Sequence, residues 1–386
     1  MDFEKESQKE TRTFATFKDE LQRMATWLKQ EGVERVVMES TGIYWRSVYE
    51  VLEAQEITAS VVNARHVKNV PGRKTDVADS EWLADLCVYG LVRASFIPPK
   101  DLRDLRMLTR YRRKLVEQKA SEKNRVQKVL ESIGLRLNNV ISDKGGVSAR
   151  RMIDAIIAGS SVPEELVELC HKRLHSKKET LKRALVGEPT DRHRFILKQI
   201  RDHIRWLEDS IYEIDEQVVT AMQPYMKEWE LLQTIPGINT MSAAMLLSEI
   251  GVDMEAFGSA DALSSWAGLC PGNHETAGKK KEFGRYTEII ISKPCFANAP
   301  KVQSRRRANF ERAIHAMVIR RGHNRTIVAI AHKLLEVIYI LISRRVPYKD
   351  STVDVEEVIV RRNAPRWIQA LKKFGYLKPD GVVGLG

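Results

Sequence analysis

Two aspartates three residues apart, Asp76 and Asp79, have the residue type and spacing best suited to chemistry in this chain. They lie at the expected start of a helix, where positions i and i+3 share one face. Upstream, the run Val36–Glu39 is expected to form a buried strand that ends in a third acid. Carboxylates are the hard ligands that Mg²⁺ and Mn²⁺ prefer, and two such ions can clamp both reacting oxygens of a phosphodiester. The three acids therefore predict metal-dependent cutting or rejoining of nucleic acid. The alternative is that the aspartates only complement a helix dipole on a solvated surface.

The composition is that of a globular protein, with 386 residues of which 43% are apolar and 30% are charged. This length predicts two or three domains. The sequence contains no apolar run as long as a membrane span, and its charged N-terminus excludes a secretory signal. The four cysteines form no CxxC pair and indicate neither a disulfide framework nor a zinc site, so we expect a cytoplasmic protein.

The net charge of +12 is concentrated in two stretches. Residues 101–136 carry eleven Lys or Arg against five acids, and residues 277–325 carry thirteen against three. Arginine-rich basic surface predicts binding to a phosphate backbone, although solvated helix faces remain an alternative. The candidate nucleic-acid-binding side chains in these stretches are Arg110, Arg112, Arg113, Lys114, Lys279, Lys280 and Lys281. Arg73 and Lys74 could steady a scissile phosphate beside the acids, or could simply be solvated.

The first 98 residues alternate between strand-like and helix-like runs. The expected order is a strand at Glu34–Glu39, a helix at Tyr44–Gln55, a strand at Ile57–Val62 and a helix at Asp79–Val88. Such an order predicts an α/β unit with a mainly parallel sheet covered by helices. The pair Pro98–Pro99 is expected to close this unit.

Most of the remaining chain has helical periodicity. Long helices are expected at 100–133 and 191–222, with short helices at 149–186 between them. The apolar residues of 191–222 alternate spacings of three and four, which predicts a coiled coil or helical hairpin that could serve dimerisation. An ordinary amphipathic helix packed on its own domain is the alternative.

A Pro-Gly turn interrupts the next helical segment. Pro236 and Gly237 lie between two expected helices, where a tight turn exposes backbone N–H groups to a phosphate. This arrangement resembles a helix-hairpin-helix, which clamps DNA without reading its sequence. A further helix is expected at Thr326–Ile342. The resulting domain boundaries are 1–98, 99–229, 230–350 and a tail at 351–386.

Long motifs resemble those of a known family. The runs VVMESTGIYWRSVYEVLE, GRKTDVADSEWLADL and LTRYRRKLV are similar to the N-terminal RuvC-like domain of DEDD-type insertion-sequence transposases, the insertion-sequence family one-ten. The runs LLQTIPGINTMSAAMLLSEIG, WAGLCPGNHETAGKKK and RTIVAIAHKLLEVIYILISRRVPY are similar to that family's C-terminal transposase domain. The resemblance spans nearly the whole chain. It implies an α/β RNase H/RuvC-like domain, followed by mostly α-helical coiled-coil and C-terminal domains.

The resemblance also implies a mechanism. The second, third and fourth of the family's four metal-binding acids match Glu39, Asp76 and Asp79, with Mg²⁺ or Mn²⁺ as the expected ion. The family's nucleophilic serine, which forms a covalent phosphoseryl link to DNA, corresponds to Thr276. Neighbouring His274 could accept a proton there, or could be plain surface. The implied partners are DNA, a structured guide RNA and further copies of the chain in a homodimer or homotetramer.

The sequence departs from the family pattern in three places. The family's first Asp lies on an opening strand, whereas this chain joins the pattern only near Lys9, so we expect that strand to be missing. The nucleophile position holds Thr276, whose branched Cβ stiffens its side chain. Residues 285–309 contain two prolines and a β-branched run where the family continues into a helix. A local frame change or decay of the gene is our hypothesis for that stretch.

The sequence thus predicts a transposase or site-specific DNA recombinase that cleaves DNA by metal-assisted transesterification. Two other classes stay open. One is a catalytically inactive remnant that only binds nucleic acid, and the other is a metal-dependent nuclease without a covalent intermediate. A covalent adduct that is lost when Thr276 is changed separates recombination from both alternatives.

Overall fold

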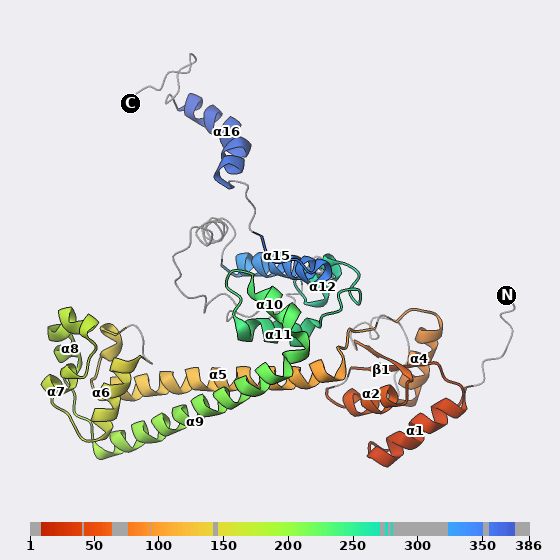
Figure 1. The fold of residues 1–386 in the computed structure, drawn as a ribbon, viewed down its shortest axis with the longest axis horizontal. Coiled ribbons are helices and arrows are strands. Elements are labelled where there is room, and N and C mark those ends of the chain that lie inside the picture. The colour runs from red at the N-terminus through yellow and green to blue at the C-terminus, as the bar shows by residue number, and fades with distance from the viewer. Residues whose placement is uncertain are drawn as a thin grey trace. The chain divides into compact units, whose positions relative to one another are not determined.

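The computed structural model divides the chain into two compact units, Met1–Pro98 and Pro99–Gly386. Within each unit, buried apolar residues form hydrophobic clusters of their own. The residues that the structure describes are 9–40, 42–63, 76–92, 94–141, 146–270, 275–276, 279–280, 323–349 and 355–374. Helices predominate among them (Figure 1). Of these described helices, none is long and apolar enough to cross a membrane.

The first unit combines helices with two parallel strands. Its elements are α1 (Lys18–Gln30), β1 (Arg35–Glu39), α2 (Trp45–Ala54), β2 (Thr58–Val62) and α4 (Asp76–Val88). The strands pair in register from Arg35 with Thr58 to Glu39 with Val62. Helix α2 is the crossover between them, as parallel pairing requires. The expected strand–helix–strand–helix order is confirmed, and α4 begins at Asp76, three residues before the expected start.

A small hydrophobic core fixes the faces of β1. Ala25 of α1, Leu52 of α2 and Ile57 are buried together, and Val36 and Met38 pack against them. Since successive residues of a strand point to opposite faces, the intervening positions of β1 belong to its other face. Strand β1 also contacts α4.

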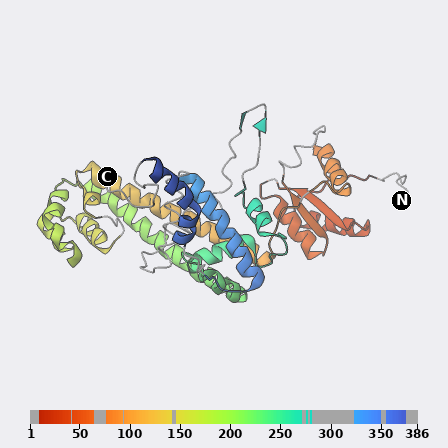
Figure 2. The same ribbon diagram turned by 90° about the horizontal axis from the view of Figure 1, so that it is seen from above.

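The second unit is built on a hairpin of two long helices, α5 (Lys100–Ser132) and α9 (Asp191–Ala221). They lie side by side in both views (Figures 1 and 2). Leu115 of α5 and Leu207 and Ile211 of α9 form a buried cluster between them. The heptad spacing of α9 is therefore used for packing within one chain, as a helical hairpin. Its role in dimerisation stays a prediction.

Short helices follow the end of α5 and precede α9, as the sequence predicted. They are η1 (Leu137–Asn139), α6 (Val147–Ile157), α7 (Pro163–Glu168), η2 (Lys172–Lys177) and α8 (Lys178–Ala184). Their apolar faces form one cluster with the adjoining turns of α5 and α9, including fully buried Met152 and Leu197. Burial of these side chains compensates for the low intrinsic stability of helices this short.

The second unit continues after α9 with further helices and a short β-hairpin. They are η3 (Gln223–Tyr225), α10 (Met226–Gln233), α11 (Thr240–Ile250), α12 (Ala260–Trp266), β3 (Glu275–Thr276), β4 (Lys279–Lys280), α15 (His323–Arg344) and α16 (Val355–Lys373). Leu102 and Leu105 of α5 share a core with α10, α11, α12 and α15. Helix α11 is buried along most of its length and contacts α5. Helix α15 extends slightly beyond both expected ends. The division of the second unit into residues 99–229, 230–350 and 351–386 stays a prediction.

Candidate catalytic residues and nucleic-acid interface

Glu39 is the last residue of β1 and is partly buried. The pairing with β2 continues past it, because Ser40 N donates to Val62 O at 2.9 Å. Its backbone is therefore held at the carboxyl end of both parallel strands. The alternation of side chains along β1 assigns Glu39 to the face opposite Val36 and Met38, away from the small core.

The other two acids begin a helix that touches this strand. Asp76 is the first residue of α4 and Asp79 lies one turn further on. Helix α4 contacts β1, so the two elements that carry the three acids are neighbours in the first unit (Figure 1). The side chains of Asp76 and Asp79 are outside the described part of the structure, and convergence of the three carboxylates stays a prediction.

Several sequence predictions fall on residues that the structure does not describe. They concern the basic residues Arg73, Lys74 and Lys281, His274, the N-terminal residues before Lys9, and the stretch 285–309. The structure does not test these predictions, and each of them stays a prediction from the sequence.

Thr276 lies in a short hairpin. Strands β3 and β4 pair antiparallel, with Thr276 opposite Lys279 and Glu275 opposite Lys280. Two residues, Ala277 and Gly278, join the strands. Two residues containing glycine between two short runs are a hairpin signal, but no hairpin was predicted here. The backbone of Thr276 is therefore paired with that of Lys279, and Lys280 lies opposite the preceding residue. The side chains of these residues are outside the described part of the structure.

The turn between α10 and α11 has the predicted form. Gly237 has a φ of +94°, which glycine adopts far more readily than other residues. Ile235 and Ile238 are buried on either side, whereas Pro236 and Gly237 are exposed. Asn239 caps α11 by accepting a hydrogen bond from Ser242 N at 2.8 Å. The apolar anchors and the cap fix an exposed backbone turn in one conformation.

Two of the basic candidates on α5 are ion-paired to other helices of the unit. Arg110 donates to both carboxylate oxygens of Glu249 on α11, at 2.7 and 2.9 Å. Arg112 makes a two-point contact with Asp215 on α9. A guanidinium held in this way has fewer donors left for a phosphate. The structure thus gives Arg110 and Arg112 roles in joining helices.

Lys114 is the most exposed of the four basic candidates on α5, with 73% of its side chain accessible. Its ammonium lies 3.7 Å from Glu117, and Arg113 contacts the same carboxylate at 3.0 Å. Ion pairs of this kind, exposed and within one helix, are weak, so phosphate oxygens can replace Glu117 at little cost. Lys114 is accordingly the candidate best placed to meet nucleic acid.

A buried polar contact between α5 and α11 escaped the sequence analysis. Arg106 donates to the carbonyl oxygens of Ser248 and Glu249, at 3.1 and 2.7 Å, and so caps the end of α11. Thr109 and Ser248 share a hydrogen bond of 3.1 Å beside it. Burial lowers the pKa of the Arg106 guanidinium, and the nearby Glu249 carboxylate opposes that shift. No local sequence signal pairs residues so far apart in the chain.

Two family models match parts of this chain. One, described as "Transposase" and named for the DEDD transposases of IS110, matches residues 1–134. The other, described as "Transposase IS116/IS110/IS902 family", matches residues 229–289. The chain belongs to the IS110 family of transposases. This confirms the resemblance drawn from the motifs, since the matched ranges include the segments that carry Glu39, Asp76, Asp79 and Thr276.

Curated relatives agree with membership of the IS110 family. The pilin gene-inverting protein of Moraxella bovis is 28% identical over 191 residues, which cover 48% of this chain and 58% of that protein. The chain thus spans little more than half the length of that relative. A probable family 20 transposase of Pseudomonas aeruginosa is 22% identical, covering 81% of this chain and 85% of its own length. The transposase for insertion sequence element IS1111A of Coxiella burnetii is also 22% identical, covering 81% and 79%.

Proposed function

We propose that this IS110-family chain is a transposase, a DNA recombinase that moves an insertion sequence by cutting and rejoining DNA strands. The observation that carries the proposal is the contact between α4, which begins at Asp76, and β1, which ends at Glu39. Family membership supports the same reaction. The contact matters because one ion can bind three acids only if the elements that carry them are neighbours.

The first unit is proposed to be a RuvC-like domain. Its parallel strands, with α2 as the crossover and α4 against β1, are compatible with that fold. In such a domain, Glu39, Asp76 and Asp79 would hold Mg²⁺ or Mn²⁺. Three carboxylates supply the hard oxygen donors that these ions require. When bound, the ions stabilise negative charge on the scissile phosphate and its two reacting oxygens.

Thr276 is the proposed nucleophile. Its hydroxyl oxygen would attack phosphorus and form a phosphothreonine ester with one DNA end. The bond from phosphorus to the leaving oxygen of the other end breaks, and that oxygen takes up a proton. The lysine positions of β4, opposite Thr276 and Glu275, would favour the phosphate through their positive charge. Arg73, Lys74 and Lys281 are proposed to contact the backbone phosphates.

The second unit is proposed to supply much of the nucleic-acid surface. Exposed Lys114 on α5 and the turn at Gly237 can meet phosphates, the first by charge and the second through backbone N–H groups. Arg110, with 54% of its side chain exposed, could exchange Glu249 for a phosphate at the edge of this surface. The proposed partners are DNA, a structured guide RNA and further copies of the chain.

A covalent-adduct assay tests the proposal. The full chain is incubated with Mg²⁺, a supercoiled plasmid carrying its gene with the flanking DNA, and RNA transcribed from those flanks. Denaturing gels should show nicked DNA and a protein–DNA adduct that resists boiling in detergent. The adduct should disappear in Thr276→Ala, and both products should disappear in Asp76→Asn.

The two alternative classes give different results in the same assay. A nuclease cuts DNA without an adduct, and its cleavage survives Thr276→Ala while failing in Asp76→Asn. A protein that only binds retains the plasmid in a mobility-shift assay but leaves it uncut in the presence of Mg²⁺ or Mn²⁺. Either result would contradict the proposed recombinase function and favour the corresponding alternative class.

A further inference from the structure

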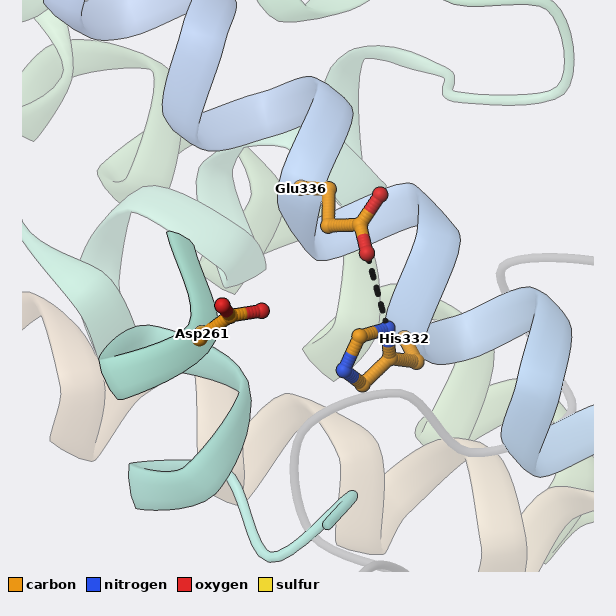
Figure 3. A group of neighbouring side chains, drawn as sticks. All are labelled: Asp261, His332 and Glu336. Carbon is orange, nitrogen blue, oxygen red and sulfur yellow. Dashed lines mark ion pairs between the residues drawn. The ribbon is translucent and has the colours of Figure 1, made fainter. Parts of the chain in front are cut away.

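Asp261, His332 and Glu336 gather where α12 packs against α15 in the second unit. Figure 3 shows the Asp261 carboxylate pointing from α12 toward the other two side chains, which lie one turn apart on α15. One potential ligand atom from each residue lies within 4.8 Å of the others. Two oxygens and one imidazole nitrogen thus approach each other from two helices.

Both helices are held firmly beneath this cluster. Leu263 of α12 is fully buried, and so is Leu335 of α15. Both belong to the large core that also includes α10 and α11. Because the apolar faces are packed, the three polar side chains start from fixed backbone positions. Changes of side-chain rotamer are then sufficient to bring the ligand atoms into coordination distance, and the backbone of the two helices need not move.

The cluster carries more negative charge than the nearby cations balance. His332 Nδ1 lies 3.1 Å from Glu336 Oε1, and the exposed Lys333 ammonium lies 2.6 Å from Glu336 Oε2. Within the described part of the chain, no cationic side chain lies within ion-pair distance of the Asp261 carboxylate. A divalent cation would supply the missing positive charge at this place.

A second histidine–glutamate pair provides a comparison for the pair His332–Glu336. His203 Nδ1 lies 3.3 Å from Glu122 Oε1, where α9 meets α5. Among the described residues, that pair is not joined by a third histidine, cysteine, aspartate or glutamate in a metal-binding arrangement. The histidine–glutamate contact is therefore common to both places, and Asp261 is what distinguishes the cluster on α12 and α15.

We propose that Asp261, His332 and Glu336 bind a divalent transition-metal ion, for which Zn²⁺ is the best fit. Zinc is commonly held by one to three imidazole nitrogens with carboxylate oxygens, and water can complete a tetrahedral set. The ion would join α12 to α15. Since the segment that leads to Thr276 leaves the end of α12, the ion would also fix the start of that segment. The proposal uses other residues than the catalytic hypothesis and stands independently of it.

Zinc titration of the full chain tests this site. The protein is stripped of metal with a chelator and titrated with Zn²⁺ in competition with a chromogenic chelator, while Co²⁺ is followed by its visible absorption. We expect one Zn²⁺ per chain at this site, with affinity lowered at least about tenfold by Asp261→Asn, His332→Gln or Glu336→Gln. The Co²⁺ spectrum should change in His332→Gln, because that variant loses the nitrogen ligand.

Matched variants separate this site from other metal binding. His203→Gln removes the comparison histidine and Glu39→Gln alters the proposed catalytic acids, so both should leave this Zn²⁺ affinity unchanged. Lys333→Met should bind Zn²⁺ at least as tightly as the original chain, because it removes a competing cation. Zn²⁺ should also raise the melting temperature of the original chain more than that of His332→Gln, with circular dichroism confirming that the metal-free variants are folded.

Two results would overturn the proposal. One is Zn²⁺ affinity in His332→Gln equal to that of the original chain, or lowered equally by His203→Gln. The other is undiminished affinity in Asp261→Asn, which would remove the link between the two helices.

Discussion

At the scale of single residues, partners decide what each charged side chain can do. Arg106 and Lys114 lie on the same helix, yet Arg106 caps α11 from a partly buried position, whereas Lys114 is largely exposed. A count of basic residues treats both as phosphate ligands. The contacts of Arg106 join two helices, whereas the exposed ammonium of Lys114 stays the proposed phosphate ligand.

Replacing Thr276 tests its proposed role as the nucleophile. Thr276→Ser should raise the rate of covalent-adduct formation, by up to about a hundredfold, because serine lacks the methyl group that restricts and crowds the attacking oxygen. Quenched-flow samples resolved on denaturing gels measure this rate. A slower rate in Thr276→Ser would show that the site is shaped around threonine, and an unchanged rate in Thr276→Ala would exclude the residue as nucleophile.

Removing the Arg106 side chain, which caps the end of α11, should destabilise the second unit. Arg106→Met leaves the carbonyl oxygens of Ser248 and Glu249 at the end of α11 without this donor, and we expect a loss of about 2 kcal/mol in the free energy of unfolding. Urea denaturation followed by circular dichroism measures it. The control is Arg205→Met, which loses only an exposed pair with Asp202 and should change stability by less than about 0.5 kcal/mol. Equal effects of the two substitutions on the free energy of unfolding would contradict the stabilising role of Arg106.

At the scale of elements, the α5–α9 hairpin and the turn at Gly237 illustrate how far sequence periodicity reaches. The three-and-four spacing in α9 predicted both the helix and its buried stripe, since Ile204, Leu207 and Val218 are all buried. The glycine between Ile235 and Ile238 predicted a tight turn, and its positive φ agrees. Patterns within one element were therefore sufficient for these features.

Contacts between distant elements could not be predicted in this way. His332 and Glu336 are four residues apart on one helix, but Asp261 joins them only because α12 packs on α15. The same holds for Arg106 with the end of α11. Local spacing does not encode which helices become neighbours, so the cross-helix half of each cluster was missed. The proposed grouping of Glu39 with Asp76 and Asp79 came from family resemblance as well as spacing.

The hairpin should be sensitive to a cavity at its centre. Leu207→Ala removes a fully buried side chain between α9 and α5, and we expect a loss of about 3 kcal/mol in the free energy of unfolding. The control Ile196→Ala, at a residue of α9 that is 45% exposed, should cost about 1 kcal/mol or less. Chemical denaturation of both variants measures the difference. Equal costs would contradict the packing of α9 on α5.

The Pro-Gly turn should matter for nucleic acid as well as for stability. Gly237→Ala forces a side chain into a left-handed backbone conformation, costing about 1 kcal/mol, and displaces the exposed N–H groups. We expect weaker binding to a fluorescent duplex DNA in anisotropy titrations. Gly258→Ala is the matched control, since Gly258 also has a positive φ, of +73°, with open space around it. A weakening of DNA binding by both variants alike would deny the turn a specific role.

At the scale of the whole molecule, we propose a different task for each of the two units. The first unit would supply the acids for metal from β1 and α4, and the second would supply basic side chains, the Pro-Gly turn and Thr276 from helices and a short hairpin. Membership of the IS110 family supports DNA recombination as the reaction that both units would serve. The proposed chemistry requires Glu39, Asp76 and Asp79 to share an ion, because Thr276 would otherwise have no activated phosphate to attack.

Manganese binding tests that claim most directly. Free Mn²⁺ is measured by electron paramagnetic resonance during titration of the full chain, with His332→Gln present in every variant so that the cluster on α12 and α15 does not contribute. Glu39→Gln, Asp76→Asn and Asp79→Asn should each weaken binding at least about tenfold, whereas Asp19→Asn, at the exposed start of α1, should not. Undiminished Mn²⁺ binding in Glu39→Gln would contradict the shared ion and, with it, the proposed chemistry.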